Sequence, residues 1–122
     1  MRSVKLTIDG REVSVAEGAT LGSGVVVVFE EGLDILPYLR RIAAFFRDES
    51  CGQCVPCRIG TVRQEELLAR LVSKQTRGDE RIVLAELAQC MRDASICGLG
   101  QTASSAIESA FARLDPLGGG RA

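Results

Sequence analysis

Three cysteines in one short segment give the clearest indication of chemistry in this chain. Cys51, Cys54 and Cys57 are separated from one another by two residues each. With this spacing, one tight loop can present three thiolates to a small metal cluster, while the fourth ligand comes from a distant part of the chain. Cys97 is the candidate for the fourth ligand, because it lies at a predicted break between two helices. The cysteine pattern therefore predicts an iron–sulfur cluster.

Glycines accompany these cysteines at positions 52, 98 and 100. A glycine lets the backbone approach a cluster closely, and its amide can donate a hydrogen bond to a sulfur atom and raise the reduction potential. The positive charge of Arg58 could offset part of the negative charge of a four-thiolate cluster. The alternative is that Arg58 is an ordinary solvated residue on the first turn of a helix.

Zinc is the main alternative for a group of four cysteines. Structural zinc sites usually combine two CxxC pairs, sometimes with histidine, whereas this chain has a three-plus-one arrangement and no histidine. The odd number of cysteines and the absence of a secretion signal also argue against a disulfide framework. The fifth cysteine, Cys90, lies on the predicted helix that carries Leu87 and Met91, and we expect it to be a small buried hydrophobic residue rather than a ligand.

Composition narrows the class of protein further. The 122 residues suffice for one domain, 46% of them are hydrophobic and 4% are aromatic, which favours helices with an aliphatic core. The formal charge is −1 and the basic residues are dispersed, so no nucleic-acid partner is expected. The start of the chain has no signal-peptide apolar segment, and no apolar run has the length of a membrane span, so we expect a cytoplasmic protein.

Motifs for catalysis are absent from the sequence. It contains neither a GxGxxG segment nor a P-loop, which are the usual signatures of dinucleotide and triphosphate binding. Histidine, the commonest general base, is missing, and no serine has a nucleophile-elbow context. We therefore expect a protein without catalytic residues of its own.

A short β segment and four helices are the predicted scaffold of the cysteine segments. Residues 4–8 and 12–15 flank the hairpin signal Asp9-Gly10, and residues 25–29 form an apolar run of strand length. Apolar residues then recur at helical spacing, with Asp34 as the expected N-cap of the first helix. These periodic segments cover residues 35–46, 62–72, 83–91 and 103–114, and the intervening segments 49–58 and 95–100 are expected to be the loops that carry the cysteines.

The predicted fold class is mostly α. We expect a four-helix bundle-like iron–sulfur domain with a small N-terminal β-hairpin. The domain organisation follows the same pattern: a β segment at residues 1–30, a helical cluster-binding domain at residues 31–115 and a flexible tail at residues 116–122.

The two cysteine segments also carry a family resemblance. Residues 49–58 (ESCGQCVPCR) and 95–101 (SICGLGQ) closely resemble the C-terminal iron–sulfur region of the flavin-carrying subunit of respiratory complex I. Related subunits of NAD-reducing hydrogenases and NAD-dependent formate dehydrogenases are similar. The resemblance covers roughly residues 24–114 and implies a helical bundle with one [4Fe-4S] cluster at its end. The ligands that it implies are Cys51, Cys54, Cys57 and Cys97.

The chain departs from that family in three respects. The family's flavin- and NADH-binding domain has no counterpart here, so this chain alone is expected to bind neither FMN nor NAD. Ile59 occupies the position of a glutamate in the family. Residues 4–21 resemble the opening hairpin of a [2Fe-2S] ferredoxin-like domain but lack that domain's cysteines.

Together these features predict an electron-transfer subunit or module that relays single electrons through one [4Fe-4S] cluster. The larger assembly would be an NAD(P)-linked oxidoreductase, such as a formate dehydrogenase, a hydrogenase or a complex I-like enzyme. The expected partners are subunits that contain flavin or molybdenum. Two alternatives remain open: a structural zinc module for protein interaction, and an assembly or regulatory factor with a labile cluster.

Overall fold

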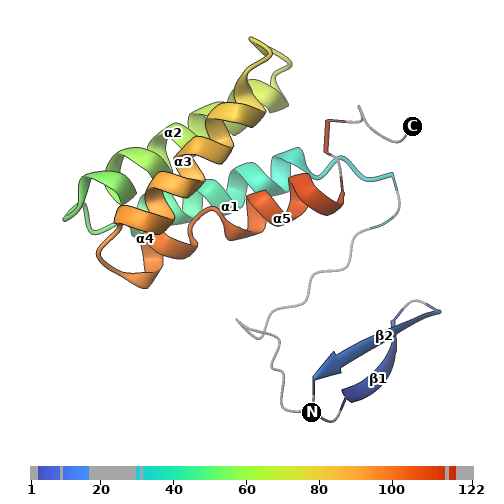
Figure 1. Ribbon diagram of the computed structural model, residues 1–122. Coiled ribbons are helices and arrows are strands. Elements are labelled where there is room, and N and C mark those ends of the chain that lie inside the picture. The colour runs from blue at the N-terminus through green and yellow to red at the C-terminus, as the bar shows by residue number, and fades with distance from the viewer. Residues whose placement is uncertain (1–2, 9, 17–29, 31, 115, 118–122) are drawn as a thin grey trace. The chain divides into compact units, whose positions relative to one another are not determined.

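The structure, a computed structural model, divides into two compact units (Figure 1). The units are Met1–Leu33 and Asp34–Ala122. The expected third strand at residues 25–29 and the last five residues of the expected tail, 118–122, lie outside the described part of the chain. The residues that the structure describes are 3–8, 10–16, 30, 32–114 and 116–117.

The first unit contains two paired strands, β1 (Ser3–Ile8) and β2 (Arg11–Ala16). They are antiparallel, and Ile8 pairs with Arg11 next to the turn. Gly10 in the turn has φ +72°, a left-handed conformation that glycine adopts without steric strain. Lys5 and Glu12 are diagonal neighbours across the strands and form an exposed ion pair of 2.7 Å.

The second unit is helical, which confirms the mostly α fold class. Within the described residues its elements are α1 (Leu36–Glu49), α2 (Val55–Val72), α3 (Glu80–Ala94), α4 (Gly98–Thr102) and α5 (Ser105–Arg113). The short helix α4 was not expected, because residues 95–100 were predicted to be a loop. Glycine weakens a helix by only about 1 kcal/mol relative to alanine, and the contacts of α4 with α2 and α3 offset this penalty.

The first helix begins slightly later than the sequence suggested. Asp34 Oδ1 accepts a hydrogen bond from the backbone N–H of Leu36 at 3.0 Å, so its side chain does satisfy one of the free amides at the helix start. Ile35 occupies the N-cap position, however, and Pro37 lies in the first turn. The aspartate therefore caps the helix from one residue before the N-cap.

The core of the helical unit joins four of its helices. α2 packs against α1 and α3, and α5 packs against α1 and α3. The apolar residues that meet in this core recur at intervals of three or four along each helix, which places them on one face. They are Ile35, Leu36, Leu39, Ala43, Leu67, Leu68, Leu71, Leu84, Ile107, Ala110 and Phe111.

An ionic network also connects α1 to α2. Glu65 on α2 is only 9% exposed. Its carboxylate accepts a hydrogen bond of 2.9 Å from Arg40 Nε and lies 3.2 Å from Arg47 Nη1. Arg40 and Arg47 are seven residues apart and therefore lie on the same side of α1, two turns apart. Two cationic partners compensate for removing this carboxylate from water.

Glu80 stabilises the connection between α2 and α3. Its carboxylate accepts hydrogen bonds from the backbone N–H groups of Arg77 at 2.6 Å and Gly78 at 2.9 Å. The hydrogen bond from Arg77 is the largest cause that holds the pKa of the Glu80 carboxyl below its ordinary value. The sequence predicted only a favourable negative charge at the start of this helix, whereas Glu80 also closes the preceding loop. Among the described residues, no helix combines the length and apolar character needed to cross a membrane.

Candidate metal centre

The four cysteines expected as ligands line a single hollow of the helical unit. Cys51 and Cys54 lie in the α1–α2 connection, Cys57 in the first turn of α2 and Cys97 in the α3–α4 connection. The two connections lie at the same end of the helices (Figure 1). The hollow has a volume of about 110 Å³. Its lining consists of Glu49, Ser50, Cys51, Gln53, Cys54, Cys57, Cys97 and Leu99.

Two helices begin directly after a cysteine. Cys54 is the N-cap residue of α2 and Cys97 is the N-cap residue of α4, and both have extended backbone conformations. The expectation that residues 49–58 are entirely loop was wrong at both ends, since α1 extends to Glu49 and α2 already begins at Val55. Proline is well suited to the first turn of a helix, and Pro56 occupies that turn. Cys57 is consequently a helical residue.

The cysteines differ in their exposure to solvent. Cys57 is buried, Cys54 is intermediate, and Cys51 and Cys97 are exposed. A group held in the hollow would therefore have one buried cysteine ligand, Cys57, and one side near the protein surface.

Hydrogen-bonding groups lie close to two of the cysteine sulfur atoms. Ser50 Oγ lies 3.3 Å from Cys57 Sγ. Hydrogen bonds to backbone groups of Ile96 and then of Cys57 lower the pKa of the Cys54 thiol, and the Ser95 hydroxyl contributes in the same direction. The thiolate is the form of cysteine that binds metals. The surroundings of Cys54 thus favour the thiolate form, which can bind a metal.

The three glycines near the cysteines serve different purposes. Gly52 has φ +76°, and its N–H donates to Ser50 Oγ at 3.4 Å rather than to a cysteine sulfur. A Cβ atom on Gly100 would lie 2.3 Å from Ser95 Oγ and 2.9 Å from Cys57 Cβ, so only glycine fits there. A Cβ atom on Gly98 would meet nothing within 4 Å. Close approach is therefore a reason for glycine at position 100 but not at position 98.

Arg58 acts on the cysteine loop through the backbone. Its Nη1 donates a hydrogen bond of 3.1 Å to the carbonyl oxygen of Gly52. This bond connects the first turn of α2 to the segment between Cys51 and Cys54. The guanidinium is exposed but is not simply solvated, and its charge is held beside the loop.

The expectation that Cys90 is buried was wrong. Cys90 is exposed on α3 and does not line the hollow. The buried residues of α3 in this region are Ala88 and Met91. Since successive residues of a helix differ in direction by about 100°, Cys90 points away from the face that Met91 occupies.

The donor set fits an iron–sulfur cluster. Cluster iron atoms take separate cysteine ligands, four thiolates for a [4Fe-4S] cluster, so the ligands must surround a volume rather than a point. The four cysteines line one hollow. Within the described ranges, no three histidine, cysteine, aspartate or glutamate side chains are gathered closely enough to hold a single metal ion.

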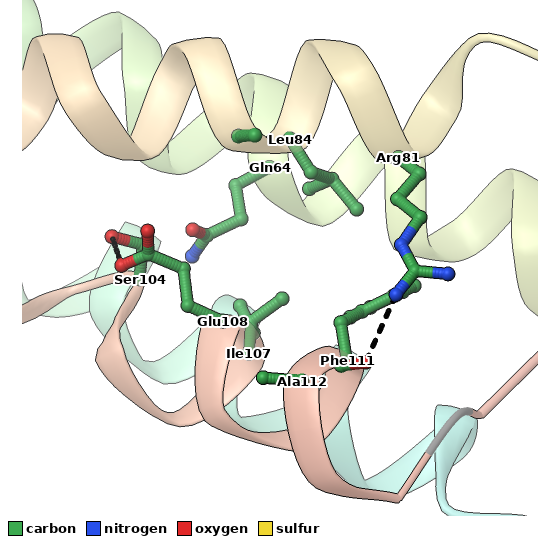
Figure 2. Close-up of a pocket in the computed structure, with 9 residues that line it drawn as sticks. Gln64, Arg81, Leu84, Ser104, Ile107, Glu108, Phe111 and Ala112 are labelled. Atoms are coloured by element: carbon green, nitrogen blue, oxygen red, sulfur yellow. Dashed lines mark hydrogen bonds between the residues drawn. The ribbon is translucent and has the colours of Figure 1, made fainter.

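A second hollow, of about 340 Å³, lies between α2, α3 and α5 (Figure 2). Its polar groups are engaged within the chain: Arg81 Nη2 donates to the Phe111 carbonyl at 3.1 Å, and Gln64 Nε2 donates to the Ala103 carbonyl at 3.1 Å. None of the described residues that line it is a cysteine. The cysteine chemistry belongs to the smaller hollow.

A helical unit with three clustered cysteines and one distant cysteine around a common hollow defines a class of iron–sulfur binding regions. The family described as "NADH-ubiquinone oxidoreductase-F iron-sulfur binding region" matches residues 37–116. The chain belongs to this family, which confirms the resemblance inferred from the two cysteine segments. The family is named for a [4Fe-4S] cluster, in agreement with the cofactor expected from the sequence.

Individual relatives are subunits of multi-subunit oxidoreductases. One NADH-quinone oxidoreductase subunit, in Rickettsia bellii, is 36% identical over 93 residues, which are 76% of this chain and 22% of that protein. NADP-reducing hydrogenase subunit HndC of Solidesulfovibrio fructosivorans is 36% identical over 110 residues, which are 88% of this chain and 22% of that protein. The chain thus spans about a fifth of the length of the relatives that it matches.

A solved structure has the same fold. One chain in the crystal structure of an NAD⁺-reducing [NiFe]-hydrogenase in the H₂-reduced state is similar with a TM-score of 0.74 and 30% sequence identity. The match covers 84% of this chain and 18% of that chain.

Proposed function

We propose that this chain holds one [4Fe-4S] cluster through Cys51, Cys54, Cys57 and Cys97 and relays single electrons within a larger oxidoreductase. The observation that carries the proposal is that these four cysteines, from two segments far apart in the sequence, line one hollow. Membership in an iron–sulfur binding family supports it. When bound, the cluster would supply a one-electron redox couple.

The residues around the hollow define what the protein itself contributes. The four thiolates would hold the cluster, Ser50 would contact the sulfur of Cys57, and the guanidinium of Arg58 would keep the cysteine loop in place. The exposed positions of Cys51 and Cys97 would let a redox partner approach the cluster. Ile59 is 48% exposed and does not line the hollow, so the change from the family's glutamate leaves the lining intact.

Exposed apolar side chains next to the ligands support a partner at this end of the helices. Val55 and Ile96 directly follow or precede a ligand cysteine, and both are well exposed. Burying these two side chains against a partner would remove apolar surface from water. We propose partners that contain flavin or molybdenum, in an NAD(P)-linked hydrogenase, formate dehydrogenase or complex I-like assembly. The names of the relatives support that setting.

No catalytic group is assigned to the chain in this proposal. Its role is to accept an electron from one partner and deliver it to another. Electron transfer through the cluster requires no proton donor or nucleophile from the polypeptide, which is consistent with a lining of cysteine, serine, glutamine, glutamate and leucine.

Metal analysis of anaerobically purified protein is the first test. We expect about four iron and four sulfide per chain, with a rhombic EPR signal after reduction by dithionite. If protein purified from iron-replete cells contained stoichiometric zinc and gave no EPR signal, the chain would instead be a structural zinc module.

Cysteine variants test the ligand assignment. Cys57→Ser should abolish the cluster, Cys97→Ser should destabilise or convert it, and Cys90→Ser should leave iron content and EPR spectrum unchanged because Cys90 is outside the hollow. A Cys97→Ser protein whose cluster is as stable as that of the wild type would favour a factor with a labile, incompletely ligated cluster.

A further inference from the structure

Ser50 directs its hydroxyl group at one of the cysteines. Its Oγ lies 3.3 Å from Cys57 Sγ and also accepts the N–H of Gly52 at 3.4 Å. The Gly52 contact uses a lone pair of the oxygen, so the hydroxyl proton is available for the sulfur. A ligating Cys57 is a thiolate and has no proton to donate. The Ser50 hydroxyl must then be the donor.

Ser95 is the second serine beside the cysteines, and its environment is more enclosed. It is 6% exposed, and its Oγ has no hydrogen-bond partner among the described residues. The Ser95 side chain lies against Gly100 on the side where Cys57 also approaches it. Buried hydroxyl groups without a partner are uncommon in native proteins, and a redox role or a bound ion is one explanation for them.

The backbone holds Ser95 in this position. The Ser95 carbonyl accepts a hydrogen bond of 3.0 Å from Gln101 Nε2. On the other side, a Cβ atom at Gly100 would approach both Ser95 Oγ and Cys57 Cβ. Glycine at position 100 therefore lets the Ser95 hydroxyl lie next to the cysteines instead of being displaced by a side chain.

We propose that the hydroxyl groups of Ser50 and Ser95 donate hydrogen bonds to ligand thiolates in the cluster-bound protein, Ser50 to the thiolate of Cys57, and raise the reduction potential of the cluster. This inference rests on the proposed function, since it assumes that these cysteines ligate a cluster. It assigns a redox-tuning role to two side chains from different connections, one after α1 and the other after α3.

The direction of the effect follows from charge. Reduction adds one electron to a cluster whose four thiolate ligands are already negative, so the sulfur atoms become stronger hydrogen-bond acceptors. A donor in a poorly solvated site therefore stabilises the reduced state more than the oxidised state. The electron comes from a redox partner or a chemical reductant, and the hydroxyl protons remain on their oxygen atoms in both states.

The test is a redox titration of the full chain followed by EPR. Ser50→Ala and Ser95→Ala should each lower the midpoint potential, by an amount equivalent to about a tenfold change in the equilibrium constant, or about 59 mV for one electron. Ser50→Thr retains a hydroxyl and should restore the wild-type potential. Ser73→Ala is the matched control, because the Ser73 hydroxyl donates to the Ala69 carbonyl at the opposite end of α2, and its potential should not change.

A second measurement separates hydrogen bonding from a general structural role. Electron–nuclear double resonance of the reduced protein in H₂O and D₂O should detect exchangeable protons coupled to the cluster, with one coupling missing in each alanine variant. The proposal requires both serines to act, so an unchanged potential and unchanged couplings in either alanine variant would overturn it. If the Ser95→Ala protein loses its cluster, the midpoint potential of the Ser50→Ala protein still tests the proposal. A wild-type protein without any cluster would instead refute the proposed function.

Discussion

Gly60 on α2 lies directly against Met91 on α3. A Cβ atom on Gly60 would be 2.6 Å from both Cγ and Sδ of Met91, and Met91 is completely buried. The absence of a side chain at position 60 thus allows the two helices to approach closely at this point. Because Gly60 follows Cys57 by three residues and Met91 precedes Cys97 by six, this contact helps to set the distance between the two cysteine-bearing connections.

Gly60→Ala should therefore destabilise the protein. Overpacking a filled core typically costs about 1–3 kcal/mol, and the better helix propensity of alanine offsets about 1 kcal/mol of this. We expect a net loss of up to about 2 kcal/mol in the free energy of unfolding, measured by chemical denaturation. Met91→Ala in the same chain should relieve the clash, so the two changes should be non-additive. A Gly60→Ala protein as stable as the wild type would show that Met91 moves aside freely.

Gly100 and Gly98 form a matched pair within one short helix. Gly100→Ala should displace Ser95 or Cys57, because its new methyl group would overlap both side chains. We expect a loss of about 1–3 kcal/mol in stability and faster loss of the cluster. Gly98→Ala enters open space and should change stability by less than about 1 kcal/mol. The rate at which a chelator bleaches the cluster absorbance measures the difference, and equal rates in the two variants would contradict the close-packing argument.

Arg58→Gln should weaken retention of the cluster with little effect on global stability. The change removes the hydrogen bond from Arg58 Nη1 to the Gly52 carbonyl, a contact of about 0.5–1.5 kcal/mol, and frees the cysteine loop. We expect cluster loss to a chelator to accelerate by roughly tenfold, which corresponds to about 1.4 kcal/mol. Arg63→Gln is the control, because exposed Arg63 on the same helix pairs only with Glu66 among the contacts described. Similar rates for both variants would argue against a specific role of Arg58.

Glu80 predicts a pH dependence of stability. Backbone hydrogen bonds from the Arg77 and Gly78 amides, with a smaller contribution from the charge of Arg70, depress the pKa of Glu80 in the folded protein. Its stabilising contribution is therefore fully present above the unfolded-state pKa, about 4.3, and is lost as the pH falls through the lower folded-state value.

The measurement compares wild type with Glu80→Gln by chemical denaturation at several pH values. At pH 7 the wild type should be the more stable protein. The difference should shrink as the pH decreases below about 4.3, because the protonated carboxyl of the wild type then resembles the neutral amide. A difference that is constant over this range would mean that the Glu80 carboxylate does not gain from the two backbone amides.

The helical pattern was readable from the sequence because the periodicity of apolar residues is local. Leu39, Leu68, Leu84 and Ile107 were all expected on core faces and are all buried. The same periodicity also included Leu114, which is mostly exposed. A helical repeat places residues on one face but does not say how far the neighbouring helix extends over that face.

Polar contacts between distant segments could not be predicted from a comparable pattern in the sequence. The ionic network of Glu65 with Arg40 and Arg47 joins two helices, and nothing in the local sequence distinguishes Glu65 from the exposed Glu66 beside it. Cys90 was expected in the core from its neighbours and its residue type, yet its direction on α3 leaves it exposed. Burial depends on which helix covers a position, and that is a tertiary property.

The chemistry open to this protein follows from its amino-acid sequence, since the number, spacing and thiol character of its cysteines restrict the cofactors that it could bind. The helices follow from the sequence as well, because propensity and periodicity act over a few residues. Two relationships became visible only in the folded chain: Gly100 rather than Gly98 needs to be a glycine, and a serine hydroxyl is buried next to the cysteines. They arise from the packing of segments that are distant along the chain, where contacts depend on the whole set of helices and on no single local pattern.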